Sequence, residues 1–381
     1  MPNGIEQICK RCVMDATDPL ISFDEKGFCN HCRRYEEEAK RILRSPLERE
    51  QALEKLVDNI KQAGKGKEYD CVIGVSGGVD STYVAYLVKQ LGLRPLAMHV
   101  DNGWNSELSV GNIEKCLKKL GIDLYTEVLD WNEFKELQKA FLRASVPDGE
   151  IPTDHAIRAT LYHQAVKRGV SYLVLGTNFV TESIMPHSWS AGHGDWRYIR
   201  FINQRFGKKP LKTFPHFSLF DQFRYLVIHR LRIISILDYV DYNKEEIIQL
   251  LKDELGWTPY PGKHYESIYT RFFQGYVLPA KFGYDKRKAH LSTLIMSGQI
   301  TRDEALKGLK DLPLSGQMLE EDMDFVLKKF DLEQEEFEAI MALPPKSYND
   351  YPNQELVSKI IKKTQPLRFI RDIGLVPKKE G

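Results

Sequence analysis

The chain has 381 residues, and its 54 Lys and Arg residues nearly balance its 53 Asp and Glu residues, for a net charge of +1. This balance gives no support for a nucleic-acid or membrane-surface partner, and the 42% apolar content is ordinary for a globular protein. No uncharged apolar run is long enough to span a membrane, and the opening MPNGIEQICKRC lacks the apolar stretch of a secretory signal. We therefore expect a cytoplasmic protein with two or three domains.

Two pairs of cysteines mark residues 1–35 as a small separate module. The pairs CKRC and CNHC contain Cys9, Cys12, Cys29 and Cys32, with 16 residues between the pairs. Two C-x2-C turns at this spacing predict a four-thiolate site for structural zinc. An iron–sulfur cluster, which also takes four cysteines, is the alternative. A segment this short has no core of its own, so we expect the metal to fold it.

The next two segments are a linker and an α/β domain. Residues 36–66 are charged and predict a connecting helix and loop, whereas residues 67–200 alternate between strand and helix patterns. The expected strands are 69–76, 94–101, 123–130 and 171–178, and the expected helices are 80–92, 109–121, 131–144 and 154–169. This alternation predicts a doubly wound parallel sheet. Such sheets bind ligands beyond the carboxyl ends of their strands, so the loops after these strands are the candidate site.

Strand signals fade after about residue 186, and residues 201–381 are expected to form a mainly helical substrate or partner domain. The segment FRYLVIHRLRIISIL at 223–237 is the most apolar, and its pattern is helix-like. Further helices are predicted to begin at the capping residues Asn243 and Thr301.

The stretch VIGVSGGVDS at residues 72–81 runs from the first expected strand into a helix. It is not a Walker A loop, but its glycines let backbone N–H groups turn toward one anion, and the helix directs its positive end to the same place. A carboxylate among phosphates is explained by a bridging Mg²⁺, so Asp80 is also a catalytic candidate. The candidates for binding ATP phosphates are Ser76, Gly77, Gly78, Asp80, Ser81 and Thr82.

This loop resembles the SGGxDS motif of the PP-loop ATP pyrophosphatases. The resemblance implies that a substrate carbonyl oxygen attacks the α-phosphorus of ATP, which releases pyrophosphate and leaves an adenylate. Ammonia or sulfide then displaces AMP. The resemblance also implies that Asp101 and Asn102 lie near the adenosine, and that Gly176, Thr177 and Asn178 form a second loop near ATP.

Several longer stretches resemble a narrower family, the N-acetyl sugar amidotransferases of bacterial surface-polysaccharide and nonulosonic-acid pathways. With the cysteine pairs, the resemblance covers most of the chain, about residues 5–310, and its stretches are 99–107, 176–183, 263–279 and 286–306. It implies that the acetamido oxygen of an N-acetylated, nucleotide-linked sugar is adenylated. Ammonia then converts the amide to an acetamidine, which gives an acetamidino sugar.

The source of the ammonia is expected to be a second protein. A glutaminase needs a nucleophilic cysteine, but residue 2 is Pro2 and no cysteine has a GxCxG setting. The resemblance therefore implies a separate glutaminase subunit with a barrel-type ammonia-channel companion, like those of histidine biosynthesis. Asp154 and His155 lie in an acid-rich region at a helix start, where they either cap the helix or meet ammonia or the sugar.

The remaining catalytic candidates follow in the second half of the chain. Lys263, in YPGKHYES, is expected to stabilise the departing pyrophosphate. His264 is expected to orient a group or move a proton, and Glu266 to face the sugar or a metal. Arg271 could share a helix face with His264.

The alternative function is that of a tRNA sulfurtransferase, because some of these thiolases share the adenylation step and begin with paired CxxC modules. The stretch 197–232, with nine Lys and Arg residues and one acid, would then be an RNA surface. Two features argue against this alternative. Zinc-bearing thiolases usually read SGGKDS, where this chain has Val79, and only Cys71 and Cys116 lie outside the pairs. A nucleic acid is therefore not the expected partner.

Overall fold

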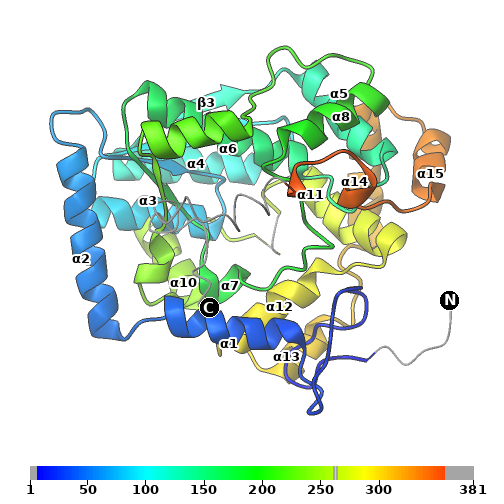
Figure 1. The fold of residues 1–381 in the computed structure, drawn as a ribbon, viewed down its shortest axis with the longest axis horizontal. Coiled ribbons are helices and arrows are strands. Elements are labelled where there is room, and N and C mark those ends of the chain that lie inside the picture. Colours follow the sequence, from blue (N-terminus) through cyan, green and yellow to red (C-terminus); the bar gives the residue numbers. More distant parts are fainter. Residues whose placement is uncertain (1–6, 261, 263–264, 357–381) are drawn as a thin grey trace.

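A five-stranded parallel sheet organises the computed structural model, which describes residues 7–260, 262 and 265–356 (Figure 1). The strand order is β3-β2-β1-β4-β5, and every neighbouring pair is parallel. The strands are β1 (Cys71–Gly74), β2 (Pro95–Asp101), β3 (Asp123–Val128), β4 (Tyr172–Leu175) and β5 (Arg232–Ser235). The predicted doubly wound α/β class is thereby confirmed.

The central strand β1 is apolar throughout because both of its faces are covered by helices. Cys71 and Ile73 point into one buried cluster, and Val72 between them points into another, as the alternation along a strand requires. The first cluster includes residues of α3 (Val79–Gln90), α4 (Glu107–Leu120) and α10 (Lys244–Leu255), and the second those of α6 (Ile151–Lys167).

A larger helical core lies beside the sheet and joins segments from both halves of the chain. Buried aromatic side chains dominate it, among them Trp104, Phe141, Tyr198 and Phe330. The helices that contribute to it are grouped on one side of Figure 1: α5 (Trp131–Arg143), α8 (Trp196–Phe206), α11 (Ile268–Phe272), η3 (Phe273–Phe282), α14 (Gly316–Phe330) and α15 (Gln334–Ala342). Trp104, which could have stacked on a ligand, is thus a core residue.

The segment 223–237 was wrongly predicted to be helical along its length. It contains the π-helix η1 (Arg224–Ile228) and then the edge strand β5, where Ile233 pairs with Leu173. Consecutive isoleucines favour an extended backbone, and tertiary pairing with β4 decides the outcome. The sheet therefore continues past residue 200, where the sequence suggested that the ATPase domain ends.

The two predicted helix caps in the C-terminal half are confirmed. The Asn243 side chain accepts hydrogen bonds from the first turn of α10, and Thr301 forms a capping box with Glu304. The short elements that complete this half are α7 (Phe179–Glu182), α9 (Leu219–Phe223), η2 (Ile236–Tyr239), α12 (Lys286–Met296), α13 (Arg302–Gly308) and η4 (Tyr348–Asp350).

The N-terminal module packs against the rest of the chain instead of standing apart. Its four cysteines share a buried cluster with Phe179 at the start of α7, Trp189 and Ala289 of α12. In Figure 1 its helix α1 (Asn30–Ile42) runs beside α12, and α2 (Pro46–Ala63) then follows one edge of the molecule. Residues 36–66 thus contain parts of two helices where one was predicted.

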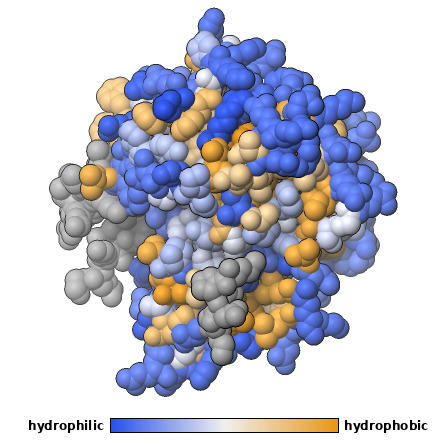
Figure 2. All heavy atoms as spheres, turned by 90° about the vertical axis from the view of Figure 1, so that its right-hand side faces the viewer, coloured by the Kyte–Doolittle hydropathy of each residue, from blue (hydrophilic) through white to orange (hydrophobic). Residues whose placement is uncertain are grey.

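The surface on the side of α14 and α15 is mostly hydrophilic, with smaller hydrophobic patches between the polar groups (Figure 2). Within residues 7–260, 262 and 265–356, we find no helix that combines the length and the apolar character needed to cross a membrane.

Candidate functional site

The loop between β1 and α3 is shaped for close approach to an anion. Gly77 has a φ of +80°, and a Cβ at this position would lie 2.6 Å from the Ser109 carbonyl oxygen, so only glycine fits. The Gly77 carbonyl accepts hydrogen bonds from Trp257 Nε1 at 2.9 Å and from the Tyr260 hydroxyl at 3.1 Å. These contacts hold the Gly77 carbonyl on the side of Trp257 and Tyr260 and fix the conformation of the loop.

The loop hydroxyls converge at the start of α3. Ser76 Oγ and Ser81 Oγ are 3.1 Å apart, and Ser81 Oγ also accepts from the Ser76 N–H at 3.1 Å. The Gly78 N–H donates to Ser76 Oγ at 3.3 Å, and Gly78 is the N-cap of α3. Thr82 follows in the first turn and is buried. Hydroxyls, N–H groups and a helix N-terminus in one place fit the phosphates of ATP.

Asp80 lies in the first turn of α3, and its carboxylate accepts a hydrogen bond from the Tyr242 hydroxyl. Burial, together with the charge of Asp80, raises the pKa of Tyr242 well above its usual value. The tyrosine therefore stays protonated and fixes the carboxylate beside the loop. A carboxylate held at this position suits a Mg²⁺ bound to ATP phosphates.

The end of β2 supplies the next predicted residues. Asp101 Oδ1 accepts from the Gly103 N–H at 2.9 Å. Asn102 is buried, and its Nδ2 donates to Thr153 Oγ1 at 3.3 Å, in the first turn of α6. Both residues thus shape the loop after β2, at the carboxyl edge of the sheet.

The loop after β4 reaches the same edge. A Cβ on Gly176 would lie 3.1 Å from the backbone of Asp80 and Ser81, so this loop packs directly against the start of α3. Thr177 Oγ1 is 2.9 Å from Ser235 Oγ of β5, and Asn178 caps α7. The structure therefore brings the three predicted loops together, while their contact with ATP remains a prediction.

Glu266 enters this site from the C-terminal half. A Cβ on Gly78 would lie 2.7 Å from Glu266 Oε1, so the carboxylate is next to the phosphate loop. The Glu266 carbonyl accepts from the Ser106 N–H at 2.9 Å, and its neighbour Ser267 forms a bridge with Asn105. Lys263 and His264 lie outside the described residues.

Arg271 forms an ion pair with Asp322 of α14, while its predicted relation to His264 lies outside the described residues. Its Nε donates to Asp322 Oδ2 at 2.7 Å and its Nη2 to Asp322 Oδ1 at 2.5 Å, and its guanidinium lies 4.8 Å from the centre of the Tyr265 ring. In this arrangement Arg271 joins α11 to α14. The sequence could not show this because Asp322 is 51 residues away.

A group of acids and a histidine, only partly anticipated, lies where α6 begins; Asp148 and Glu150 in it are buried. His193 Nε2 is 3.0 Å from Asp148 Oδ2, its Nδ1 is 2.7 Å from Asp154 Oδ2, and Ser190 Oγ donates to Asp148 at 2.8 Å. Burial alone would lower the pKa of His193, but the two carboxylates raise it to about 10. Burial raises the pKa of Glu150, at the start of α6, to about 8.

His155 directly follows Asp154 and packs beside this group, where its contacts are those of a structural residue. Its Nδ1 is 2.9 Å from the His193 carbonyl, and its ring stacks on Phe217 with the centroids 4.5 Å apart. Burial lowers its pKa to about 4, so the ring is neutral.

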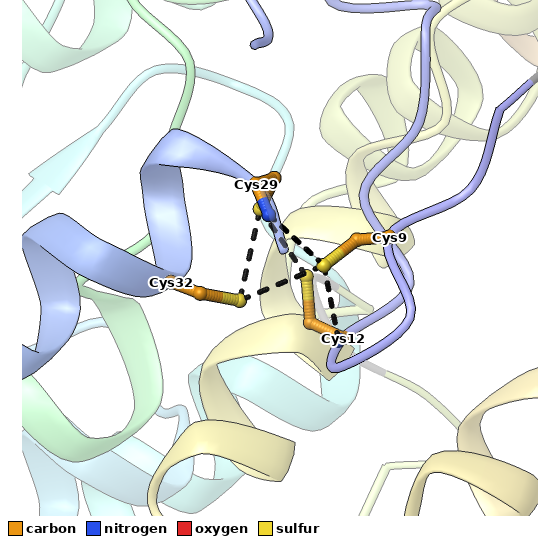
Figure 3. A group of neighbouring side chains, drawn as sticks. All are labelled: Cys9, Cys12, Cys29 and Cys32. Carbon is orange, nitrogen blue, oxygen red and sulfur yellow. Dashed lines mark hydrogen bonds between the residues drawn. The ribbon is translucent and has the colours of Figure 1, made fainter. Parts of the chain in front are cut away.

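The four predicted cysteines converge on one point (Figure 3). All four are buried, and Sγ–Sγ separations are 3.8 Å for Cys9–Cys32 and 3.7 Å for both Cys12–Cys29 and Cys29–Cys32. A tetrahedron with Zn–S bonds of about 2.3 Å has edges of about 3.8 Å. The sulfurs therefore fit a single tetrahedral ion.

Backbone contacts stabilise this cysteine cluster and attach it to α13. The N–H groups of Arg11 and Cys29 donate to Cys9 Sγ at 3.4 and 3.3 Å, which favours thiolate. The Arg302 guanidinium donates to the carbonyls of Cys9 and Cys12, both at 3.0 Å. Arg302 thus binds the turn that presents two of the ligands.

Sequence reasoning missed the aromatic residues that surround the phosphate loop. Trp257, Tyr260 and Tyr242 approach it from segments that are 162 to 183 residues away. The sequence holds a local signal for Trp257 and Tyr260. They lie in WTPYPG, which follows the helix-ending Gly256, so their hydrogen-bond donors are placed in a loop. Only the fold shows where this loop returns.

Comparison with known families gives two matches on different parts of the chain. Residues 50–206 match the NAD synthase family, and residues 266–365 match the family described as LPS biosynthesis protein WbpG-like, C-terminal domain. The first match defines an ATP-using PP-loop domain of the ligase type. Together the two support a PP-loop ATPase family of polysaccharide biosynthesis with an amidotransferase-like role, which confirms the resemblance at this level.

Structural similarity to solved proteins is weak, and a search of curated proteins gives no match. A predicted subunit of tRNA methyltransferase from Methanocaldococcus jannaschii is 16% identical, with 48% of this chain and 75% of that one covered and a TM-score of 0.28. NMN synthetase from Francisella tularensis is 16% identical, with coverages of 75% and 94% and a TM-score of 0.29. NH3-dependent NAD synthetase from Campylobacter jejuni is 15% identical, with coverages of 70% and 99% and a TM-score of 0.29. TM-scores this low support no conclusion about the function of this chain.

Proposed function

We propose that the chain is an ATP-dependent, AMP-forming N-acetyl sugar amidotransferase that makes an acetamidino sugar. One observation carries the proposal: Glu266, the first residue of the WbpG-like region, places its carboxylate at Gly78 of the phosphate loop. The region related to polysaccharide biosynthesis therefore builds part of the ATP site. A substrate held by that region would meet the α-phosphate.

The proposed reaction has two steps, adenylation of the sugar and displacement of AMP by ammonia. The acetamido oxygen attacks the α-phosphorus, the bond between the α- and β-phosphates breaks, and pyrophosphate leaves. Ammonia then attacks the activated carbon, the carbon–oxygen bond breaks, and AMP leaves with the oxygen that came from the sugar. Adenylation is needed because an amide oxygen is otherwise a poor leaving group.

The chain's own residues suggest the cofactors. The Gly77–Gly78 turn and the hydroxyls of Ser76 and Ser81 would hold the phosphates, and Mg²⁺ would lie between them and Asp80. The cysteine cluster would hold Zn²⁺, since the sulfur spacing suits one ion better than a multi-iron cluster. Metal analysis of the purified chain should give about one zinc per chain, whereas iron would contradict this assignment.

The ammonia is proposed to come from a separate glutaminase with a barrel-type ammonia-channel companion. All six cysteines of the chain lie among the described residues, and four of them form the metal cluster. Burial raises the pKa of Cys71 to about 12 and that of Cys116 to about 11. Neither thiol is suited to attack glutamine or to carry sulfur, which also argues against the sulfurtransferase.

The test is an assay of the purified chain with Mg-ATP, ammonium chloride and a panel of nucleotide-linked diacetamido sugars. We expect AMP, pyrophosphate and a sugar in which one oxygen is replaced by NH, detected by mass spectrometry. Formation of AMP only with tRNA and a sulfur donor would overturn the proposal in favour of the sulfurtransferase.

A further inference from the structure

A group of buried and half-buried polar side chains lies around the start of α6, and the reaction as proposed above assigns it no part. We call Asp148, Glu150, Asp154, His193 and Tyr269 the acidic cluster. Asp148 and Glu150 flank Gly149, which has no space for a side chain, because a Cβ there would lie 2.7 Å from Phe273 and 2.9 Å from the Tyr269 hydroxyl. The cluster is therefore closely packed on one side.

Two atoms of this cluster have unmet hydrogen-bonding capacity. Glu150 is 8% exposed, and its Oε2 accepts from Thr270 Oγ1 at 2.7 Å. Within the described part of the chain, Glu150 Oε1 and the hydroxyl of Tyr269, which is 1% exposed, have no hydrogen-bond partner. Buried polar atoms are normally paired, so an unpaired oxygen on Glu150 and an unpaired Tyr269 hydroxyl beside the adjacent Gly149 indicate a small polar ligand.

The charges around Glu150 indicate that this ligand is a cation. Among the described residues, His193 and Lys286 are the cationic side chains that act on Asp148, Glu150 and Asp154, so negative charge is in excess once Glu150 is ionised. Burial raises the pKa of Glu150, and the neighbouring charges of Asp154 and Asp148 raise it further, while Thr270 and Lys286 act in the opposite direction. A cation at Oε1 would favour the ionised form of Glu150 and compensate its negative charge, which a neutral water cannot do.

Short connections link the acidic cluster to the ATP site. Thr270, which binds Glu150, follows four residues after Glu266, whose carboxylate lies at Gly78. Thr153, three residues after Glu150, accepts a hydrogen bond from Asn102 at the end of β2. Glu150 is therefore held by segments that also reach the phosphate loop and the end of β2.

We infer that the acidic cluster binds ammonium through Glu150 Oε1 and the Tyr269 hydroxyl and delivers it as ammonia to the adenylated carbon. The inference rests on the proposed function for its second half. On binding, one ammonium proton moves to Glu150 Oε1, and the nitrogen keeps the electron pair that attacks the carbon. The carbon–oxygen bond to AMP then breaks, as in the reaction above. A glutamate with a pKa of about 8 is mostly protonated at neutral pH and is ionised above about pH 8, so it can accept this proton at mildly alkaline pH.

The functional test compares Glu150→Gln and Tyr269→Phe with Glu54→Gln, which changes an exposed glutamate on α2. Tyr269→Phe removes only an unpaired buried hydroxyl, so it should fold at least as well as the wild type. Both cluster variants should raise the ammonium KM by about tenfold or more, since a hydrogen bond to a charged group is lost. Sugar-dependent exchange of pyrophosphate into ATP, which reports adenylation alone, should not change. Unaltered ammonium KM values in both cluster variants would overturn the inference.

A binding test separates this inference from the proposed function. Crystals of the full chain are soaked in thallium(I) acetate, because thallium(I) is a monovalent cation close to ammonium in size. We expect an anomalous peak beside Glu150 Oε1 in the wild type and none there in Glu150→Gln. If no sugar supports exchange, the proposed function fails, but the thallium peak still decides whether the cation site exists. A wild-type map without that peak contradicts the site.

Discussion

Gly77 is the residue on which the shape of the phosphate loop depends most. Alanine in its place would adopt a φ of +80° and place its Cβ 2.6 Å from the Ser109 carbonyl. The backbone conformation alone costs about 1–2 kcal/mol. Gly66 offers a matched control, because its φ is +77° and a Cβ there meets nothing within 4 Å.

We therefore predict that Gly77→Ala weakens ATP binding by about tenfold or more, as the loop must shift away from Ser109. Gly66→Ala should lose a similar amount of stability through strain but should bind ATP like the wild type. Calorimetric titration with Mg-ATP measures the ATP affinity of both variants. Equal ATP affinities in the two variants would show that the loop is not the phosphate site.

His193 makes a prediction about pH. Its carboxylate partners raise its pKa to about 10, against about 6.5 in an unfolded chain. The stabilisation is therefore fully present below about pH 6.5 and is lost as the pH rises through about 10. His193→Gln should lose about 3–5 kcal/mol at about pH 6, and much less above pH 10, in urea unfolding. A loss that is independent of pH would contradict the ion-pair account.

Among the elements, α1 and α7 connect the cysteine cluster to the ATP site. The Tyr35 ring of α1 stacks on Phe179, the first residue of α7, with the centroids 4.7 Å apart. Phe179 directly follows Asn178, whose loop packs on α3 through Gly176. The cysteine module thus supports one wall of the predicted nucleotide site, although the two lie far apart in sequence.

Removal of the Tyr35 ring should disturb this support. We predict that Tyr35→Ala lowers the free energy of unfolding by about 3–5 kcal/mol and raises the KM for ATP. The Tyr35 hydroxyl is buried with no partner within the described residues, so Tyr35→Phe should be neutral or slightly stabilising. A normal ATP KM in a folded Tyr35→Ala protein would show that the module is only an attachment.

How far the elements follow from the sequence depends on how local their causes are. The phosphate loop, the CxxC pairs and the capped helices at Asn243 and Thr301 are set by adjacent residues, so they could be predicted. The strand β5 depends on pairing with β4, and Arg271 on Asp322, so neither could. Around the start of α6, the sequence indicated only Asp154 and His155 as candidates. His193 could not be predicted there because only the fold brings it close to Asp148 and Asp154.

At the scale of the whole molecule, the proposed synthetase centre draws on both halves of the chain, whereas the described residues offer no reactive thiol for glutamine hydrolysis. All nine Lys and Arg residues of the stretch 197–232 are exposed, as expected for a solvated face. We predict that the isolated chain turns over with ammonium chloride and not with glutamine. A purified glutaminase partner should restore the use of glutamine. Glutamine-dependent AMP formation by the chain alone would contradict the division into two proteins.

The most direct test of the central claim follows one oxygen atom. A nucleotide-linked sugar whose acetamido oxygen carries a heavy isotope is incubated with the chain, Mg-ATP and ammonium, and the AMP is analysed by mass spectrometry. The account predicts that the label moves from the sugar to the phosphate of AMP as the acetamidine forms. Unlabelled AMP, with the label still on the sugar, would show that the acetamido group is not the one adenylated.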